Sequence, residues 1–242
     1  MTKRIFLTML MVIILQIYLF NYFDGSKVDL TGLMIVNGVP VNSKLVIFGT
    51  WYIFISVLSF LSLGYLRQYI SGYGMYLMIR EKSRVKLGIR RIANLMILIS
   101  VLSLIQLLFS IIFAFINNSD QAFFYHDFQS FICIVGLYIM SNFVLIFIQM
   151  VLELHFTEEV SLLVINVYVL ISVTLGGVLL SVQKLTWILY FLIPNFGMYI
   201  RVDLPESGPL GLSPVIAYMV LTIVTFILSA LLYIRLKKID LT

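Results

Sequence analysis

Charged side chains are scarce in this chain of 242 residues. Only 11% of the residues are charged, whereas 62% are hydrophobic, and soluble domains are about 25% charged. A soluble domain of this length could not bury so much apolar surface, so we expect lipid to be the solvent for most of the chain. The net charge of +5 does not indicate a nucleic-acid partner, because the basic residues cluster beside apolar runs.

Cysteine and histidine are also nearly absent. The single cysteine, Cys133, lies within an apolar run, and the two histidines are His126 and His155. One cysteine excludes an internal disulfide and any multi-cysteine metal site, and two histidines are too few for a histidine-built metal centre. We therefore expect this chain to bind no metal and no cofactor.

Motifs of common enzyme classes are missing as well. The chain contains neither a P-loop nor an H-E-x-x-H zinc motif. The pair Glu158-Glu159 could suggest an intramembrane protease of the CAAX-processing type, but the fourth residue after it is Leu163 instead of arginine. A simpler interpretation is that Thr157 caps a helix whose positive end attracts both carboxylates. We predict no catalytic residue; an enzyme using Glu158, Glu159 and His155 is the alternative.

Six apolar runs are long enough to cross a membrane, since a span needs about 20 mostly apolar residues. Each must be helical, because lipid offers the backbone no hydrogen-bond partner. The runs cover approximately residues 5–23, 45–66, 92–116, 131–154, 160–181 and 214–234. No small-x-small cleavage site follows the first run, so we expect a retained span instead of a signal peptide. The prediction is one all-α membrane domain over residues 1–242.

The distribution of lysine and arginine predicts the orientation of these spans. Twelve of the sixteen fall on the side that holds both termini and the loops after the second and fourth spans. Cytoplasmic loops carry the excess of Lys and Arg, so both termini are predicted to be cytoplasmic. The four basic residues assigned to the other side are Lys27, Lys44, Lys184 and Arg201.

The segment 185–199, LTWILYFLIPNFGMY, is too apolar for an ordinary loop and too short for a span. A segment of this length is typical of a re-entrant or interfacial element. We expect one or two short helices in the outer leaflet, bent at Pro194-Asn195; the alternative is a seventh span, which would place the basic C-terminus outside. The aromatic residues expected at the headgroup level are Trp187, Tyr190 and Tyr199.

Few polar residues interrupt the spans, and no charge lies near a span centre. This argues against proton- or sodium-driven transport, which usually places ionisable residues inside the membrane. Glu153 lies near the cytoplasmic end of the fourth span, where we expect it to reach water. The polar residues that we expect to hydrogen-bond between helices are Gln16, Asn94, Gln106, Asn142, Gln149 and Asn166.

Three of the polar side chains, Gln149, Asn166 and Asn195, are also candidates for a substrate path, with helix packing as the alternative role. The fifth run carries small residues at Ser172-x-x-x-Gly176. This spacing lets helices approach closely, either within the chain, at a subunit interface or along a translocation seam.

The stretch from Arg67 to Arg91 is a basic island with seven of the sixteen Lys and Arg residues and one acid, Glu81. Its early part reads Gly72-Tyr73-Gly74-Met75-Tyr76. Three interpretations remain: charge that only sets topology, a helix lying on anionic lipid, or a bent knob that docks on a cytoplasmic protein. The aromatic and glycine content favours docking.

Six spans, a cytoplasmic knob after the second and a broken apolar segment before the sixth resemble the permease subunits of ABC-2-type exporters. The small size is similar to permeases of bacterial peptide export, including bacteriocin immunity systems. In that family the elbow between the second and third spans is a coupling helix that inserts into a separate ATPase. The resemblance places this coupling elbow within residues 67–91, with contacts at Tyr73, Tyr76, Arg80, Glu81 and Arg84. It also implies that ATP and Mg bind the partner ATPase.

The resulting expectation is a non-catalytic permease subunit in the bacterial plasma membrane that exports an amphipathic or lipophilic peptide. Its expected partners are cytoplasmic ATPase subunits, a second permease copy or paralogue, the bilayer and the peptide. The alternative is a membrane immunity or sensor protein that sequesters a peptide without ATP.

Overall fold

The computed structural model contains helices and irregular segments, and no strand among the residues that it describes. These residues are 10–16, 18, 39, 45–66, 84–116, 128–182, 186–203 and 211–238. The α-helices are α3 (Leu45–Leu61), α6 (Arg84–Ile116), α7 (Phe128–Glu153), α8 (Glu158–Val182) and α9 (Pro214–Lys238). Three short 3₁₀ helices precede α9: η2 (Thr186–Phe191), η3 (Ile193–Gly197) and η4 (Tyr199–Arg201).

Four of these helices are long and apolar enough to cross a membrane. Their apolar parts are Gly88–Phe109, Gln129–Glu153, Glu158–Val182 and Pro214–Lys237. The 17 residues of α3 extend over only about 25 Å, which is short of a hydrocarbon core about 30 Å thick. The first predicted span is described only at residues 10–16 and 18, which are helical.

The second predicted span ends earlier than expected. Its helix stops at Leu61, and turns occupy residues 62–66. Gly64 adopts a φ of 68°, in the left-handed region that favours glycine and ends helices. The prediction of a helix through Leu66 was therefore wrong. The run remains apolar to Leu66, so its hydropathy does not show that the backbone turns after Leu61.

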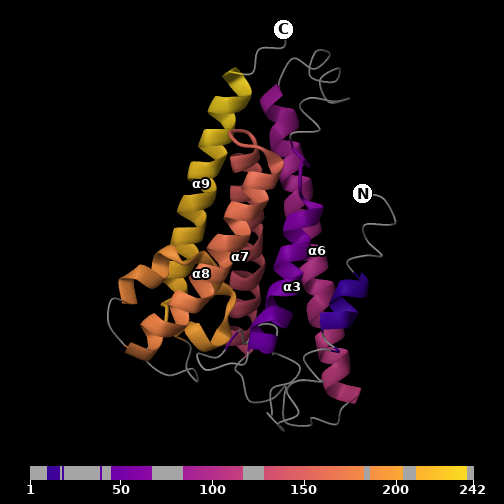
Figure 1. The fold of residues 1–242 in the computed structure, drawn as a ribbon, viewed down its shortest axis with the longest axis vertical. Coiled ribbons are helices and arrows are strands. Elements are labelled where there is room, and N and C mark those ends of the chain that lie inside the picture. The colour runs from indigo at the N-terminus through magenta and orange to yellow at the C-terminus, as the bar shows by residue number, and fades with distance from the viewer. Residues whose placement is uncertain are drawn as a thin grey trace.

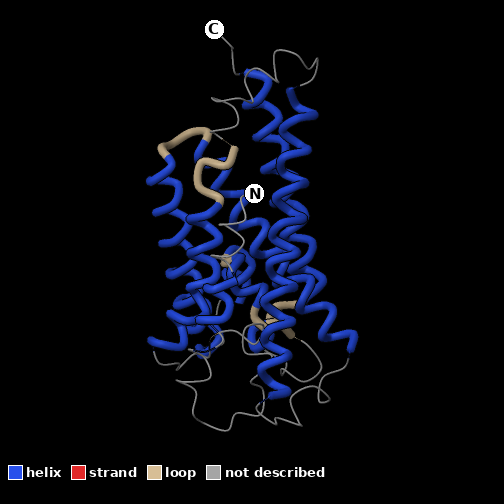
Figure 2. Tube along the Cα trace, turned by 90° about the vertical axis from the view of Figure 1, so that its right-hand side faces the viewer, coloured by secondary structure: helices blue, strands red, loops and turns tan. Residues whose placement is uncertain are grey.

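Helix α7 forms the centre of the bundle and packs against α3, α6, α8, α9 and η3 (Figures 1 and 2). In its most apolar stretch of 18 residues, 56% of the residues are buried inside the bundle, compared with 22–33% for α6, α8 and α9. Its middle, from Phe143 to Phe147, is buried without interruption. The other four α-helices and η3 therefore have α7 as their common packing partner.

The two ends of the bundle differ in composition. The start of α6, the turn from α7 to α8 and the end of α9 lie at one end, and the 3₁₀ helices lie at the other (Figure 1). We call the first the basic end, because Arg90, Arg91, Arg235 and Lys237 belong to it, and the second the broken-helix end.

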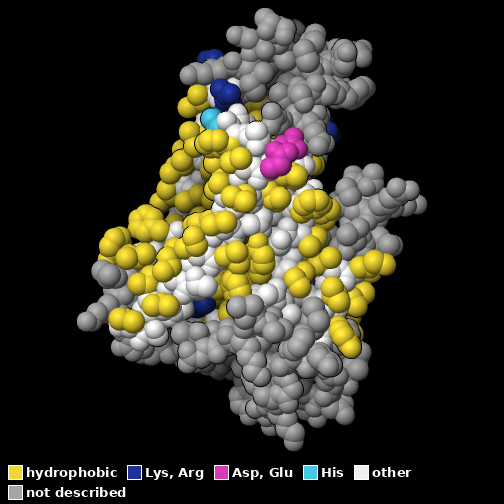
Figure 3. All heavy atoms as spheres, viewed as in Figure 1, with side chains coloured by type: hydrophobic (Ala, Val, Ile, Leu, Met, Phe, Trp, Pro, Cys, Tyr) yellow, Lys and Arg dark blue, Asp and Glu magenta, His cyan; other side chains and the backbone are white. Residues whose placement is uncertain are grey.

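Between these ends the outer surface is apolar. Large hydrophobic side chains face outward along α6, α8 and α9, including Ile97 (62% exposed), Leu163 (64%) and Phe226 (76%). Hydrophobic side chains are spread over the described part of the face in Figure 3. Soluble monomers rarely expose contiguous apolar patches larger than a few hundred Å². The chain is therefore a multi-pass membrane protein.

The broken segment before α9 is folded into the bundle. Residues 192–199 are all buried, and η3 packs against α7, α8 and α9. The approach is close: a Cβ added at Gly197 would lie 2.8 Å from the Ser141 Oγ and 3.2 Å from the Tyr138 Cα. The segment thus fills the broken-helix end instead of lying only on its surface.

Two details of the predicted segment need correction. The break falls at Leu192, one residue before η3, with Pro194 inside the first turn of η3, because proline is tolerated at a helix start. Tyr199 is only 9% exposed, whereas Trp187 (60%) and Phe191 (69%) face outward. Burial in the bundle therefore overrides the general preference of tyrosine for the headgroup level.

Candidate functional site

The predicted docking residues Tyr73, Tyr76, Arg80 and Glu81 lie outside the described residues. Arg84 is the first residue of α6, so the end of the basic island continues directly into a membrane-crossing helix. Within this continuation, Arg90 is exposed, and the Arg91 guanidinium lies 5.7 Å from the centroid of the Tyr65 ring. This cation–π contact joins α6 to the turn that follows α3.

Two predicted substrate-path residues meet near the basic end, in a group that we call the Glu153 cluster: Tyr52, Ser59, Gln149, Glu153 and Asn166. The Gln149 Nε2 donates to the Ser59 carbonyl and to the Glu153 Oε1, both at 3.0 Å, and the Ser59 hydroxyl donates to the Gln149 Oε1. The Asn166 Nδ2 lies 3.5 Å from the Ser59 Oγ, and its Oδ1 accepts from the Tyr52 hydroxyl. Ser59 therefore links Gln149 of α7 to Asn166 of α8.

Glu153 is only 1% exposed, so the prediction that it reaches water was wrong. The turn after α3 packs over it, and the Gly64 amide donates to its Oε2 at 3.1 Å. A buried carboxylate is costly unless it is hydrogen-bonded, and here Gln149 and Gly64 supply donors. Glu153 thereby fixes the end of α3 onto α7.

A second group, the Gln106 cluster, lies where the first helical segment, α3, α6 and α7 meet. The Gln106 Nε2 donates to the Gln16 Oε1, and the Tyr138 hydroxyl donates to the Gln106 Oε1, both at 2.7 Å. The Gln16 Nε2 donates to the Thr50 carbonyl at 2.9 Å. All three side chains are buried. The predicted hydrogen bonding between helices is confirmed for Gln16, Gln106, Gln149 and Asn166. By contrast, Asn94 is exposed, and the Asn142 Nδ2 is buried without a hydrogen-bond partner among the described residues.

The third predicted substrate-path residue, Asn195, belongs to a separate group at the broken-helix end, which we call the Arg201 cluster. An Nη atom of Arg201 donates to the Val173 carbonyl at 3.0 Å and to the Asn195 Oδ1, and the other donates to the Val39 carbonyl at 3.1 Å. The Asn195 Nδ2 donates to the Ser172 carbonyl at 3.1 Å. This cluster ties α8, the 3₁₀ helices and Val39 together.

Sequence reasoning missed the role of Arg201, which it counted among the charges of an external loop. The side chain is 1% exposed, and burial lowers its pKa to about 10, so it remains protonated at neutral pH. Among the described residues its Nε has no hydrogen-bond partner. A proline-and-glycine-broken apolar segment directly before an arginine is the sequence signal that could have drawn attention to it.

The small residues of α8 make room for this arginine. A Cβ added at Gly176 would lie 2.5 Å from the Asn195 Oδ1 and 2.7 Å from an Nη of Arg201. The Ser172-x-x-x-Gly176 pattern therefore serves packing within the chain, one of the roles considered for it. At Gly176 the nearest side chains are those of Asn195 in η3 and Arg201 in η4.

The acidic pair at the start of α8 has the structural role predicted for it. The Val160 amide donates to the Thr157 Oγ1 at 3.4 Å, which caps the helix, and Glu158 and Glu159 occupy the first turn. Within the described part of the chain, no three His, Cys, Asp or Glu side chains could hold a metal ion. The geometry of these residues supports helix capping.

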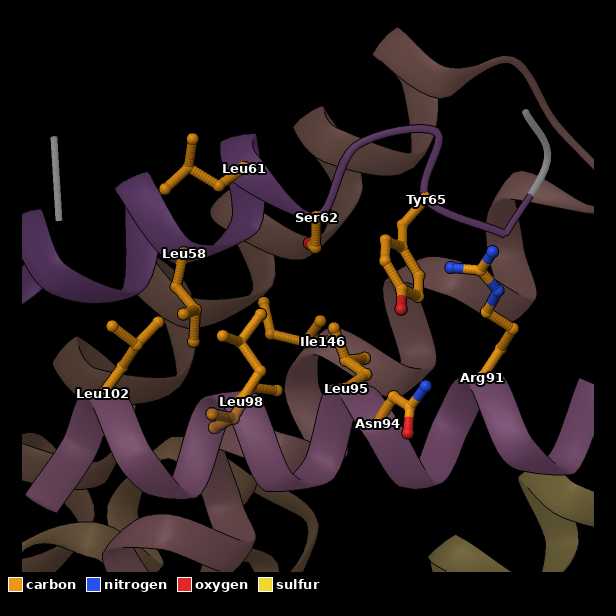
Figure 4. Close-up of a pocket in the computed structure, with 11 residues that line it drawn as sticks. Leu58, Leu61, Ser62, Tyr65, Arg91, Asn94, Leu95, Leu98, Leu102 and Ile146 are labelled. Carbon is orange, nitrogen blue, oxygen red and sulfur yellow. The ribbon is translucent and has the colours of Figure 1, made fainter. Parts of the chain in front are cut away.

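A pocket of about 290 Å³ lies between α3 and α6 near the basic end (Figure 4). Its polar residues are Ser62, Tyr65, Arg91 and Asn94. Its apolar wall consists of Leu58, Leu61, Leu95, Leu98, Ile99, Leu102 and Ile146. The Tyr65 side chain points from the turn after α3 toward α6, with Arg91 beside its ring and Asn94 facing its hydroxyl end (Figure 4). One end of the pocket is therefore polar and cationic, and the rest is apolar.

Comparisons with known proteins give a family and one relative. The family model described as "Protein of unknown function (DUF2705)" matches residues 5–242. The protein named "Uncharacterized protein YybK" of Bacillus subtilis (strain 168) is 24% identical over 249 residues, covering 98% of this chain and 96% of the relative. No solved structure matches.

Proposed function

We propose that this chain, which belongs to the DUF2705 family, is the permease subunit of an ATP-driven exporter whose ATPase is a separate chain. In this proposal the basic end faces the cytoplasm, where the Lys and Arg excess of membrane proteins lies. The ATPase binds ATP and Mg, and a second permease copy or paralogue completes the membrane part. An amphipathic or lipophilic peptide suits spans with so few charges.

The observation that carries the proposal is how both ends of the predicted coupling elbow are tied to the bundle. The segment 67–83 leaves the turn after α3, where Gly64 is bonded to Glu153 of α7. It rejoins the described chain at α6, where Arg91 contacts the Tyr65 ring. A displacement of the elbow would therefore act on α3, α6 and α7 at once.

The start of α6 is also in close contact with the end of α9. A Cβ added at Gly88 would lie 2.5 Å from the Leu236 Cδ1, and Leu236 is buried. Packed helices are coupled through such contacts because protein interiors hold little free volume. In the proposed cycle, closure of the ATPases pushes the elbow, and α6 moves relative to α9, changing the shape of the permease interface.

The experiment is co-purification of the full chain expressed together with its genomic neighbours, in which we expect an ATPase to be retained. We expect the wild-type chain to retain the ATPase in detergent. The double substitution Arg80→Ala, Glu81→Ala should reduce retention at least tenfold, because it removes the charged pair of the predicted docking knob. Lys237→Ala is the matched control: Lys237 is exposed at the same end of the bundle, and its loss should leave retention unchanged.

The same two variants separate export from passive sequestration. If the chain protects cells from a peptide by export, the double variant should lose protection together with ATPase retention. Failure of any ATPase to co-purify, with full protection in the double variant, would contradict the proposal and favour a sequestering protein.

A further inference from the structure

The pocket between α3 and α6 has the polarity of a lipid. Arg91, Asn94 and Tyr65 lie at one end, and Leu98, Leu102 and Ile146 line the remainder (Figure 4). From Arg91 to Leu102, α6 advances by about 16 Å. The hydrocarbon of one leaflet is half of a core about 30 Å thick, or about 15 Å. The pocket therefore runs from a polar end to an apolar end over the depth of one leaflet.

The polar end selects the charge of the ligand. Its ionisable cation is Arg91, and the residues that line the pocket include no Asp or Glu. The Tyr65 hydroxyl and the Asn94 amide can also donate hydrogen bonds, and Asn94 is exposed. Basic pockets between membrane helices bind anionic lipid headgroups, and a guanidinium with neighbouring donors matches a phosphate.

The volume of the pocket limits the size of the apolar part of the ligand. A volume of about 290 Å³ is at the lower limit for small-molecule sites, which occupy about 300–1,000 Å³. It suits one hydrocarbon chain more than the several bulky side chains of an amphipathic peptide. Next to the wall, α6 presents outward-facing Ile97 and Val101, so a second acyl chain could remain in the surrounding lipid.

We infer that this pocket binds an anionic phospholipid, with the headgroup phosphate at Arg91 and one acyl chain between α3 and α6. The ligand would connect the turn after α3 to α6 at the place where the chain enters and leaves segment 67–83. The site requires no ATPase and no exported peptide, so it stands independently of the transport proposal.

Native mass spectrometry of the full chain in detergent tests this site, with phosphatidylglycerol and phosphatidylcholine of identical acyl chains as probes. We expect phosphatidylglycerol adducts to be at least fivefold more abundant. Arg91→Gln should reduce them at least fivefold. Arg90→Gln, which removes the same charge from an exposed neighbour, should change them less than twofold.

A second pair of variants tests the apolar wall. Leu98→Trp fills the pocket and should abolish most phosphatidylglycerol adducts. Ile97→Trp places the same ring on the outer side of α6, where Ile97 is 62% exposed, and should preserve the adducts. Thermal unfolding in detergent identifies a variant that fails to fold. If a tryptophan variant fails to fold, the comparison of phosphatidylglycerol adducts between Arg91→Gln and Arg90→Gln tests the site. The inference would be overturned if Arg91→Gln and Arg90→Gln lost equal amounts of phosphatidylglycerol adduct, or if the two lipids bound equally. Saturable binding of a cationic amphipathic peptide instead of lipid would also overturn it.

Discussion

The Glu153 cluster and the Arg201 cluster both bury a charged residue, at opposite ends of the bundle and in different ways. Glu153 accepts hydrogen bonds from Gln149 and from the Gly64 amide, within a network that joins α3, α7 and α8. Arg201 donates to the backbone carbonyls of Val173 in α8 and of Val39, and to the side chain of Asn195 in η3. Its Nε lacks a partner among the described residues. The first cluster therefore joins helix to helix, and the second pins loops onto a helix.

This difference assigns separate roles to the two ends. At the basic end, side chains on α3, α7 and α8 bond to one another, so a force on one helix reaches the others. At the broken-helix end, one guanidinium holds η3, α8 and Val39 together. We expect single substitutions in the Glu153 cluster to lower the free energy of unfolding by small amounts. At the broken-helix end we expect most of the stabilisation to be lost with one residue, Arg201.

Loss of Arg201 should have the largest effect. Arg201→Met keeps most of the side-chain volume but leaves the Asn195 Oδ1 and the carbonyls of Val39 and Val173 without this donor. Hydrogen bonds to charged groups contribute about 1.5–3 kcal/mol each, and removing a buried charge offsets part of their loss because its desolvation cost is no longer incurred. We therefore expect a net loss of about 3 kcal/mol in the free energy of unfolding, measured in mixed micelles. A change below about 0.5 kcal/mol would show that the two ends do not differ as described.

Crowding of the Arg201 cluster should have the next largest effect. Gly176→Ala places a methyl group 2.5 Å from the Asn195 Oδ1, and overpacking typically costs about 1–3 kcal/mol. Gly49→Ala is the control on α3, because its Cβ would meet nothing within 4 Å; it should be neutral or stabilising, since alanine favours helix. The unfolding midpoints of both variants in detergent give the comparison, and equal effects would contradict it.

Single substitutions in the Glu153 cluster should destabilise the protein less than those in the Arg201 cluster. Ser59→Ala removes a hydroxyl that bonds to Gln149 and contacts Asn166, and bonds between membrane helices contribute about 1 kcal/mol. Ser103→Ala removes a hydroxyl that is equally buried but has no hydrogen-bond partner among the described residues. We expect Ser103→Ala to be neutral, and the difference in unfolding midpoint between the two variants measures the network. Identical midpoints would mean that Ser59 does not link the helices.

The sequence predicted features that depend on local pattern. Apolar runs located the four long helices to within a few residues at most ends, and Thr157 capped α8 as expected. The prediction of hydrogen bonding between helices was correct for the three span glutamines and for Asn166, and was not met by Asn94 or Asn142. The exception was the start of α6, where the helix begins at Arg84 within the basic island.

The features that the sequence did not predict depend on tertiary packing. The burial of Glu153 requires the turn at Gly64 to fold over it, and the burial of Arg201 requires space beside Gly176. Neither condition is visible in the hydropathy of the surrounding run. The same holds for the break at Leu192, because the segment is held by its contacts with α7 and α8.

The most direct test of the proposed role is site-specific crosslinking of the elbow to the co-expressed ATPase. The chain has one natural cysteine, Cys133, so Cys133→Ala provides a background for Tyr76→Cys in the elbow and Lys237→Cys at the end of α9. We predict that a thiol crosslinker joins the ATPase to the chain carrying Tyr76→Cys and not to the one carrying Lys237→Cys. Crosslinking through position 237 alone, or through neither position while the ATPase is retained, would contradict the account.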